Sequence, residues 1–229
     1  MLPPPITDAL YTERTVLTLL TEDDLPAMEA MAREPDTFKY IKKLERMSEE
    51  EYTRFLHLKL QQIKENKGYH WAVWLAPANG TSLISPGDVN PAPKINPASS
   101  INPAPTAGSS KPFIGGLNQA PTVGSSGTFI GAVNLNPIAG TGRLQIGCQL
   151  KRDFWGQGFA SELTARVLTF AIHELRLPAV YGVFEKGNNV SRRLLEKLGF
   201  VFEERSQEKE VEVETHVYTS PLTPDSHTR

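Results

Sequence analysis

The chain has 229 residues, a formal net charge of -2 and 39% hydrophobic residues, which suits one domain with a substantial core. This near-neutral charge gives no global basic field, so the composition argues against nucleic acid or an anionic membrane as partner. The single cysteine, Cys148, excludes an intrachain disulfide framework, and no stretch reaches the roughly 20 apolar residues of a membrane span. We therefore expect a cytoplasmic protein whose residues 1–229 form a single domain.

The N-terminal part of the chain predicts a strand, two helices and a second strand. Residues 15–20 are β-rich, and the acidic run 21–24 supplies an N-cap and first-turn charges for a helix. Ser48 and Glu51 form a capping box for the next helix, which is followed by a strand over residues 69–75.

Residues 78–127 differ from the rest of the chain in composition. They are rich in Pro, Gly, Asn and Ser, and the segment 105–118 is echoed by the segment 121–134. Because so polar a stretch cannot bury a core, we interpret it as a flexible insertion, with a lid or partner-binding segment as the alternative. Residues 221–229 are expected to form a flexible tail.

Each copy of the repeat contains a strand candidate, at Phe113 and at Phe129. Both begin with Phe-Ile-Gly and compete for the same place in a sheet. The second copy leads directly through a glycine-containing turn into the strand that starts at Leu144. Proximity therefore favours Phe129.

The stretch from Leu144 to Glu162 predicts a strand, a turn and the glycine-rich start of a helix. Apolar residues alternate up to Leu150, and Gly156 and Gly158 precede a helix with apolar positions at helical spacing. Such a turn leaves N–H groups unpaired at a helix N-terminus, with the positive end of the helix dipole behind them. The pattern predicts an anion site, most often a phosphate site.

A dinucleotide is one candidate ligand for this site. Glu185, at the end of the following strand, could hold a ribose, whereas Ser161 replaces the third glycine of the motif. The chain also shows one βαβ crossover rather than several. A P-loop is excluded because no Gly-Lys-Ser or Gly-Lys-Thr follows the glycines.

The remainder of the chain predicts one more strand, a short helix and a hairpin. The strand over residues 179–184 is reached through a helix and so runs parallel to the strand at Leu144. Residues 188–198 form the short helix, and strands over 200–203 and 211–219 form the hairpin.

Five segments occur in the order found in one known family. They are Tyr11 to Asp24, Phe129 to Gly131, Ile146 to Gly147, Trp155 to Glu162, and Asn188 to Phe200. On these motifs, above all Asn-x-x-Ser followed by Leu-Glu-Lys-Leu-Gly-Phe, the chain resembles the GNAT N-acetyltransferases. It is most similar to the branch that contains the ribosomal-protein N-terminal acetyltransferases. The resemblance implies a GNAT-like α/β (α+β) fold, with a mixed, mostly antiparallel, twisted sheet flanked by helices and one βαβ crossover at the cofactor site.

The resemblance also implies acetyl-coenzyme A as the cofactor and no metal. The pyrophosphate would lie on the turn formed by Trp155, Gly156, Gln157, Gly158, Phe159, Ala160 and Ser161. The pantetheine arm would run like an extra strand beside Cys148, Gln149 and Leu150. Asn188 would contact the same arm.

The implied reaction is direct transfer of an acetyl group, in a ternary complex, to a primary amine of a peptide, a protein N-terminus or a small molecule. The amine must lose a proton before attack. The oxyanion would then be held by a backbone N–H near Cys148 or Gln149. The resemblance assigns Ser191 as the hydroxyl that protonates the departing thiolate, and a helix N-cap fits the same position.

Two positions depart from the family pattern. Gln145 stands where members often carry a glutamate base, and Asp153 stands where many carry Gln or Arg. Lys151 or Arg152 could replace the missing positive charge. Because Gln145 cannot accept a proton, a non-catalytic acyl-coenzyme A sensor or scaffold protein is the alternative function.

Other ionisable groups remain candidates for catalysis. Glu185 is the first candidate base and His70 the second, and a water chain would require neither. Cys148 fits a buried structural thiol better than a nucleophile, since no histidine partner follows from the sequence. Glu162 fits the helix dipole better than binding of an amine. A homodimer is possible, and the sequence does not decide the oligomeric state.

Overall fold

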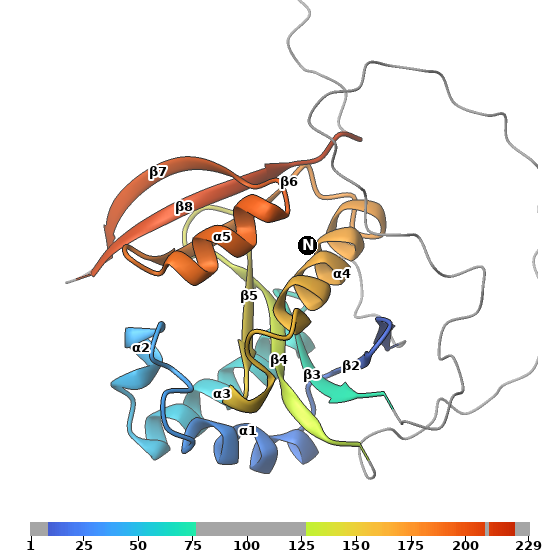
Figure 1. Cartoon of the computed structure of the whole chain (residues 1–229), viewed down its shortest axis with the longest axis vertical. Coiled ribbons are helices and arrows are strands. Elements are labelled where there is room, and N and C mark those ends of the chain that lie inside the picture. The colour runs from blue at the N-terminus through green and yellow to red at the C-terminus, as the bar shows by residue number, and fades with distance from the viewer. Residues whose placement is uncertain (1–8, 77–126, 209–210, 223–229) are drawn as a thin grey trace, which may run out of the picture.

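The structure is a computed structural model that describes residues 9–76, 127–208 and 211–222 (Figure 1). The strands are β1 (Leu10–Tyr11), β2 (Thr15–Leu19), β3 (Tyr69–Leu75), β4 (Phe129–Pro137), β5 (Leu144–Leu150), β6 (Ala179–Glu185), β7 (Val201–Glu208) and β8 (Val211–Thr219). The α-helices are α1 (Leu25–Ala32), α2 (Lys42–Glu45), α3 (Glu49–Lys64), α4 (Phe159–His173) and α5 (Asn189–Lys197). Short 3-10 helices cover Glu22–Asp24 and Arg152–Phe154.

The strands form one sheet in the order β1-β2-β3-β4-β5-β6-β8-β7. β5 and β6 are parallel, and every other neighbouring pair of described strands is antiparallel. The predicted mixed, mostly antiparallel sheet with one crossover is therefore confirmed. A doubly wound sheet needs several parallel pairs, so the dinucleotide-binding fold is excluded.

The second repeat copy supplies a strand, as proximity predicted, because β4 begins at Phe129 and pairs with β3. The first copy at Phe113 lies outside the described residues. So does the predicted insertion 78–127, apart from Gly127. Of the predicted tail 221–229, the structure describes a turn at Pro221 and Leu222.

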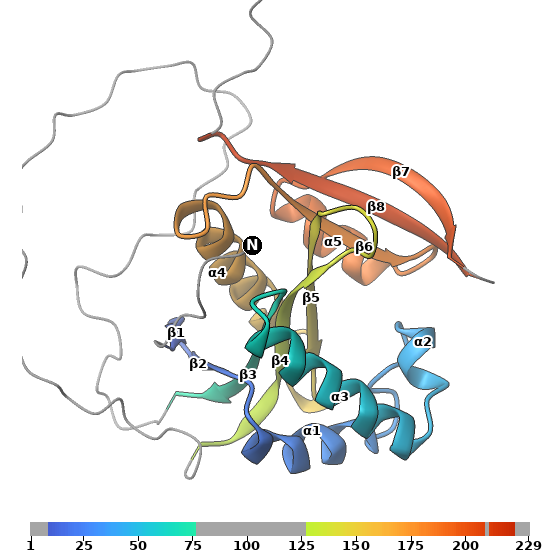
Figure 2. The same cartoon turned by 180° about the vertical axis from the view of Figure 1, so that it is seen from behind.

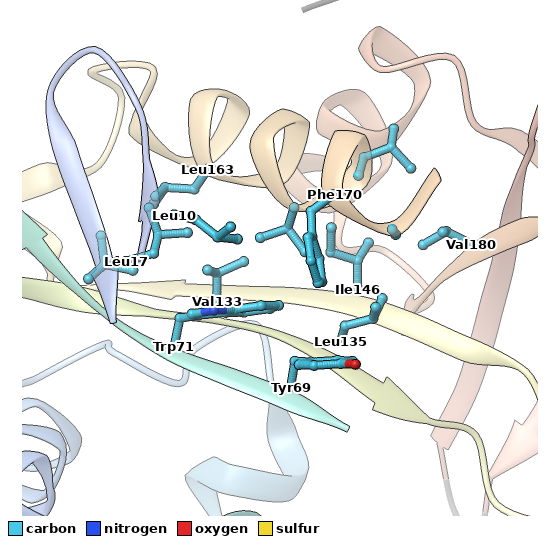
Figure 3. Close-up of a cluster of buried hydrophobic side chains, with 14 of the residues drawn as sticks. Leu10, Leu17, Tyr69, Trp71, Val133, Leu135, Ile146, Leu163, Phe170 and Val180 are labelled. Atoms are coloured by element: carbon cyan, nitrogen blue, oxygen red, sulfur yellow. The ribbon is translucent and has the colours of Figure 1, made fainter. Parts of the chain in front are cut away.

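One face of the sheet packs against α4 (Figure 3). Phe170 of this helix packs in a T-shaped, edge-to-face arrangement against two stacked rings, at centroid distances of 5.5 Å from Tyr69 and 5.7 Å from Trp71. Each such buried side chain contributes about 1.5–3 kcal/mol through removal of apolar surface from water. This packing fixes the axis of α4 on the sheet, and with it the position of the helix N-terminus next to the end of β5.

The opposite face is covered by α1 and α3 (Figure 2). The predicted capping box begins α3, since Ser48 Oγ accepts from the amide of Glu51 at 3.2 Å while the Glu51 carboxylate accepts from the amide of Ser48 at 2.8 Å. The helix predicted to start at residues 21–24 divides into a 3-10 turn and α1. Pro26 lies in the first turn of α1, where its missing N–H costs nothing. None of the helices in the described ranges could span a membrane.

Candidate active site

β5 and β6 begin as neighbours and then separate. Within these fully described strands they pair at Gln145 opposite Tyr181 and at no later residue. On its other side, β5 pairs with β4 along its whole length. Beyond Gln145, the edge of β5 that faces β6 therefore has no strand partner.

The ladder between β4 and β5 shows which backbone groups lie on that edge. Just outside β5, the amide of Lys151 donates to Ile130 at 2.9 Å and the carbonyl of Arg143 accepts from Ile138 at 2.9 Å. Because antiparallel hydrogen-bonded pairs alternate, the odd-numbered residues of β5 bond to β4. The even-numbered residues, Cys148 and Leu150 included, direct their N–H and C=O groups toward β6.

This alternation separates the two candidates for the oxyanion donor. The amide of Cys148 faces the unpaired edge, whereas the backbone of Gln149 is directed to Ala132 of β4. Any cofactor contact from Gln149 would have to use its side chain. The carbonyl of Leu150 is already occupied, since it accepts from Trp155 Nε1 at 2.8 Å.

The glycine turn follows directly and ends at the N-terminus of α4. Gly156 and Gly158 have φ values of +72° and +85°, in the left-handed region that L residues rarely adopt. Gly158 is the N-cap, and its carbonyl accepts the first helical bond from the amide of Glu162 at 3.1 Å. Among the described residues, the amides from Phe159 to Ser161 have no acceptor. These unpaired donors lie where the sequence predicts an anion site, which stays a prediction.

Arg14, which the sequence interpretation did not include, closes one side of this turn. Its Nε donates to Glu162 at 2.7 Å, its Nη1 donates to the carbonyl of Gln157 at 3.0 Å, and its guanidinium lies 3.9 Å from the ring centroid of Phe159. Glu162 is thus held by a protein cation, which supports its structural role over binding of an amine. No local pattern could reveal a contact between residues 148 positions apart.

The basic residues expected to replace a phosphate contact are engaged elsewhere. Lys151 forms an ion pair with Glu34 at 2.8 Å, and Arg152 forms one with Asp36 at 2.7 Å. Asp153 contributes its carbonyl, which accepts from the side chain of Gln157 at 2.5 Å. The candidate anion site therefore offers backbone amides and the helix dipole, with Arg14 as the adjacent cation.

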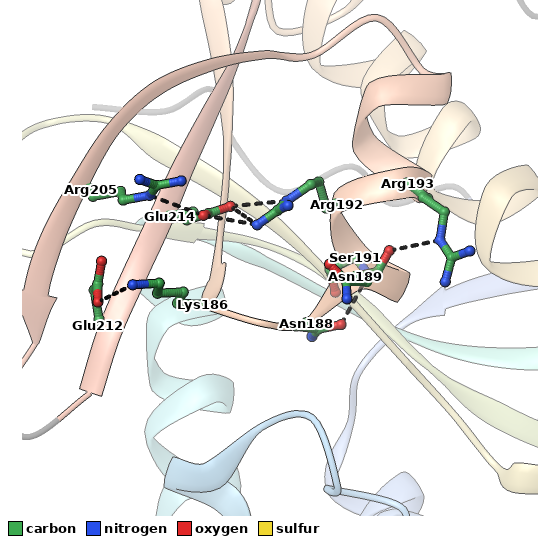
Figure 4. Close-up of polar contacts among 9 residues, drawn as sticks. All are labelled: Lys186, Asn188, Asn189, Ser191, Arg192, Arg193, Arg205, Glu212 and Glu214. Atoms are coloured by element: carbon green, nitrogen blue, oxygen red, sulfur yellow. Dashed lines mark hydrogen bonds and ion pairs between the residues drawn. The ribbon is translucent and has the colours of Figure 1, made fainter.

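Asn188 and Ser191 lie at the start of α5 (Figure 4). Asn188 is the N-cap, because its Oδ1 accepts from the amide of Ser191 at 3.0 Å. The N-cap interpretation of Ser191 is therefore wrong, and its hydroxyl has no partner among the described residues. The Nδ2 of Asn188 donates to the carbonyl of Tyr40 at 3.4 Å.

Glu185 ends β6 next to these residues, and its carbonyl accepts from the amide of Asn188 at 3.0 Å. His70 lies on β3 instead, with Nε2 3.3 Å from Gln62 Oε1. Burial, aided by the charge of Lys59, lowers the pKa of His70 to about 3. A histidine with so low a pKa is a poor base at neutral pH, so Glu185 is the better candidate.

Tyr40 joins the two halves of the candidate site. Its ring centroid lies 6.2 Å from that of Trp155 in the glycine turn, and its carbonyl binds Asn188 at the start of α5. The predicted residues thus form two groups, at the N-terminus of α4 and at the end of β6. Both groups flank the unpaired edge of β5.

Cys148 packs against the core beneath α4, and burial raises the pKa of its thiol to about 12. A thiol of this pKa is protonated at pH 7 and therefore a weak nucleophile. For the acetyl transfer that the resemblance implies, we expect Cys148→Ala to retain the rate within a few fold, and we expect Cys148 to resist iodoacetamide until the protein is unfolded. Mass spectrometry of the protein incubated with acetyl-coenzyme A and an amine provides the check, and an acetylated Cys148 would show that this view of the thiol is mistaken.

Among the described strands, the mixed sheet opens at its one parallel pair, beside helix N-terminal amides that have no acceptor. This arrangement is an acetyltransferase fold of the GNAT type. The family described as Acetyltransferase (GNAT) domain matches residues 115–201. The uncharacterized N-acetyltransferase p20 of Bacillus licheniformis is 37% identical over 59 residues, which are 26% of this chain and 33% of p20. The chain thus aligns with about a third of the length of this curated relative.

Solved structures show the same fold over most of the chain. RimL, a ribosomal-protein alpha-N-acetyltransferase in complex with coenzyme A, superposes with a TM-score of 0.63 and 11% identity, covering 93% of this chain and 98% of RimL. Spermidine N-acetyltransferase of Vibrio cholerae, in complex with coenzyme A and spermine, superposes with a TM-score of 0.57 and 17% identity. The superposition covers 90% of this chain and 95% of that enzyme. The resemblance to GNAT N-acetyltransferases predicted from the sequence is confirmed.

Proposed function

We propose that the chain transfers an acetyl group from acetyl-coenzyme A to a primary amine by direct attack. The observation that carries this proposal is the unpaired edge of β5 ending beside the free amides of α4. A pyrophosphate needs several converging donors, and an extended arm needs a free strand edge. This chain offers both within the few residues from Cys148 to Ser161.

The glycine turn has open space for a pyrophosphate as well as N–H donors for its charge. A Cβ added at Gly156 would meet no atom within 4 Å, so the turn presents open space rather than packed side chains. The amides of Phe159, Ala160 and Ser161 would hold the pyrophosphate, with Arg14 beside them. The Cys148 and Leu150 edge of β5 would bind the pantetheine arm, next to Asn188.

Acetyl-coenzyme A, when bound, supplies an activated thioester. The amide of Cys148 lies on the edge that faces this group and would donate to the developing oxyanion. As the tetrahedral intermediate collapses, the hydroxyl of Ser191 would pass its proton to the departing sulfur and take one from the nitrogen, so that the serine ends unchanged. Glu185 would take the proton of the attacking amine, because Gln145 lacks a basic oxygen and His70 has too low a pKa.

The acceptor we propose first is a peptide or protein N-terminal amine, followed by a small-molecule amine. RimL is named for a ribosomal protein and the Vibrio cholerae enzyme for spermidine, so both classes of acceptor are represented among proteins of this fold. The sensor function remains the second candidate, and Gln145 is the residue that favours it.

The decisive experiment follows thiol release from acetyl-coenzyme A with peptide N-terminal amines and small amines, while calorimetry measures cofactor binding separately. We expect amine-dependent thiol release by the wild type. Ser191→Ala should lower kcat by roughly tenfold, since a thiolate leaving group needs little acid catalysis, and leave cofactor affinity unchanged. Ser206→Ala, on the exposed strand β7, is the matched control. Tight cofactor binding without thiol release from any amine would establish the sensor function instead.

A further inference from the structure

Arg14, directly before β2, is fixed to the sheet through its backbone. Its carbonyl accepts from the amide of Ala76, just beyond the end of β3, at 2.8 Å. Its amide donates to Oε1 of Glu162 at 3.1 Å. The guanidinium therefore extends from an anchored base toward the glycine turn, which lies 143 positions later in the sequence at Gln157.

The guanidinium holds the carboxylate of Glu162 through two of its nitrogens. Nε and Nη2 of Arg14 lie 2.7 Å and 2.6 Å from Oε2 of Glu162. The side chain of Glu162 is only 21% exposed, so water alone would screen its charge poorly. Because Glu162 lies in the first turn of α4, an unpaired carboxylate there would repel an anion bound at the N-terminal amides of this helix.

The same guanidinium fixes one peptide of the glycine turn. Nη1 of Arg14 donates to the carbonyl of Gln157 at 3.0 Å. In a trans peptide the C=O and the following N–H point in opposite directions, so the amide of Gly158 is turned away from Arg14. Within the described ranges this amide has no acceptor, like the amides of Phe159 to Ser161 that follow it. Arg14 thus occupies the oxygen of this peptide and leaves its N–H available to a ligand.

Phe159 keeps the guanidinium in this position. Its ring is buried, and its centroid lies 3.9 Å from Cζ of Arg14. A planar guanidinium can stack on a ring while it donates to a carboxylate and a carbonyl, which the point charge of a lysine cannot do. Three different groups of the cofactor turn, defined as residues 155–162, therefore depend on one arginine from another part of the chain.

We propose that Arg14 is a positioning residue for coenzyme A, an inference that rests on the proposed function. It acts through Glu162 and through the Gln157–Gly158 peptide, and not as a ligand of the phosphate. By neutralising the carboxylate and binding the carbonyl oxygen, it leaves the turn with N–H donors toward the pyrophosphate and without a competing negative charge.

Calorimetry of the full chain with coenzyme A tests this role. Arg14→Ala should bind coenzyme A at least about tenfold more weakly, because a charge-assisted hydrogen bond and the neutralisation of Glu162 are lost together. Arg14→Lys restores the charge without the planar fork and should recover only part of the affinity. Arg166→Ala is the matched control, since Arg166 pairs with Glu174 at the C-terminal end of α4, at 3.6 Å, and its affinity should be unchanged.

Glu162→Gln separates positioning from direct contact with the phosphate. Added to Arg14→Ala, it removes the unpaired carboxylate and should return part of the lost affinity. At saturating acetyl-coenzyme A, Arg14→Ala should keep kcat within a few fold and a melting temperature close to that of Arg166→Ala. A general loss of structure would lower both.

The outcomes distinguish this inference from the proposed function. Wild-type affinity in Arg14→Ala would overturn the positioning role and leave the proposed function in place. A loss of affinity that Glu162→Gln does not relieve would also overturn it, because Arg14 would then act as a direct ligand. A wild type that does not bind coenzyme A would overturn the proposed function and the positioning role together.

Discussion

Gly156→Glu is expected to reduce the affinity for coenzyme A by about 100-fold or more. The new carboxylate would project from the turn whose free amides are assigned to the pyrophosphate. Two unit charges about 4 Å apart near a protein surface repel by about 4 kcal/mol, which is more than enough for this loss. Calorimetric titration with coenzyme A measures the effect directly.

Gly140→Glu is the matched control for this substitution. Gly140 lies in the turn between β4 and β5, with φ of +74° against +72° at Gly156, and a Cβ at either position meets nothing within 4 Å. Both variants therefore carry the same added charge and a similar backbone strain of about 1–2 kcal/mol. Equal losses of affinity would place the pyrophosphate elsewhere, whereas a loss confined to Gly156→Glu supports the assignment.

Glu214→Gln should have the largest effect on stability. Glu214 is 1% exposed on β8, and Figure 4 shows it between two guanidinium groups, with Nη2 of Arg192 at 2.7 Å and Nε of Arg205 at 3.1 Å. The carboxylate is buried, whereas the side chains of Arg192 and Arg205 are 33% and 55% exposed and can be solvated when they lose it. The substitution should therefore cost less than the loss of a fully buried pair, about 2 kcal/mol, and a decrease in melting temperature of roughly 4–8 °C is expected.

Glu212→Gln, on the same strand, provides the comparison. Glu212 forms an exposed pair with Lys186 at 2.8 Å, and such pairs contribute about 0–1 kcal/mol. Thermal unfolding of both variants separates the buried network from surface charge. If the two melting temperatures fell equally, the network would not carry the stability assigned to it.

Lowering the pH should reduce the difference in melting temperature between the wild type and Glu214→Gln. Desolvation acts to raise the pKa of Glu214, but the hydrogen bonds and charges of Arg192 and Arg205 outweigh it, so the pKa is lowered. A carboxyl with a lowered pKa stabilises the folded protein above its ordinary pKa. That stabilising contribution is lost as the pH falls through the lowered pKa of Glu214. Melting temperatures of the wild type and of Glu214→Gln, measured from neutral to acidic pH, provide the check.

The parts of the fold set by neighbouring residues could be predicted from the sequence. The capping box at Ser48, the strand at Leu144 and the glycine turn depend on local chemistry, and each is present in the structure. The parallel pairing of β5 and β6 also followed, because a helix connects them. The N-cap alternative for Ser191 is wrong, because Asn188 caps α5 and the helix begins one residue after it. Sequence could not separate the two positions, since both Asn and Ser are good caps.

Contacts between distant segments could not be predicted in this way. Arg14 approaches Glu162, and Glu34 and Asp36 neutralise Lys151 and Arg152, only after the sheet and its helices have assembled. Local pattern thus located the glycine turn, whereas its electrostatic surroundings required the structure.

The contact between Tyr40 and Asn188 uses a backbone carbonyl, while the contact with Trp155 uses the ring. Any residue at position 40 could keep the first contact, but an aromatic side chain is needed for the second. Substitutions at position 40 should therefore change the surface beside the glycine turn while leaving the contact with Asn188 at the start of α5 in place. The two contacts of this one residue can thus be varied separately, one through its side chain and the other only by moving its backbone.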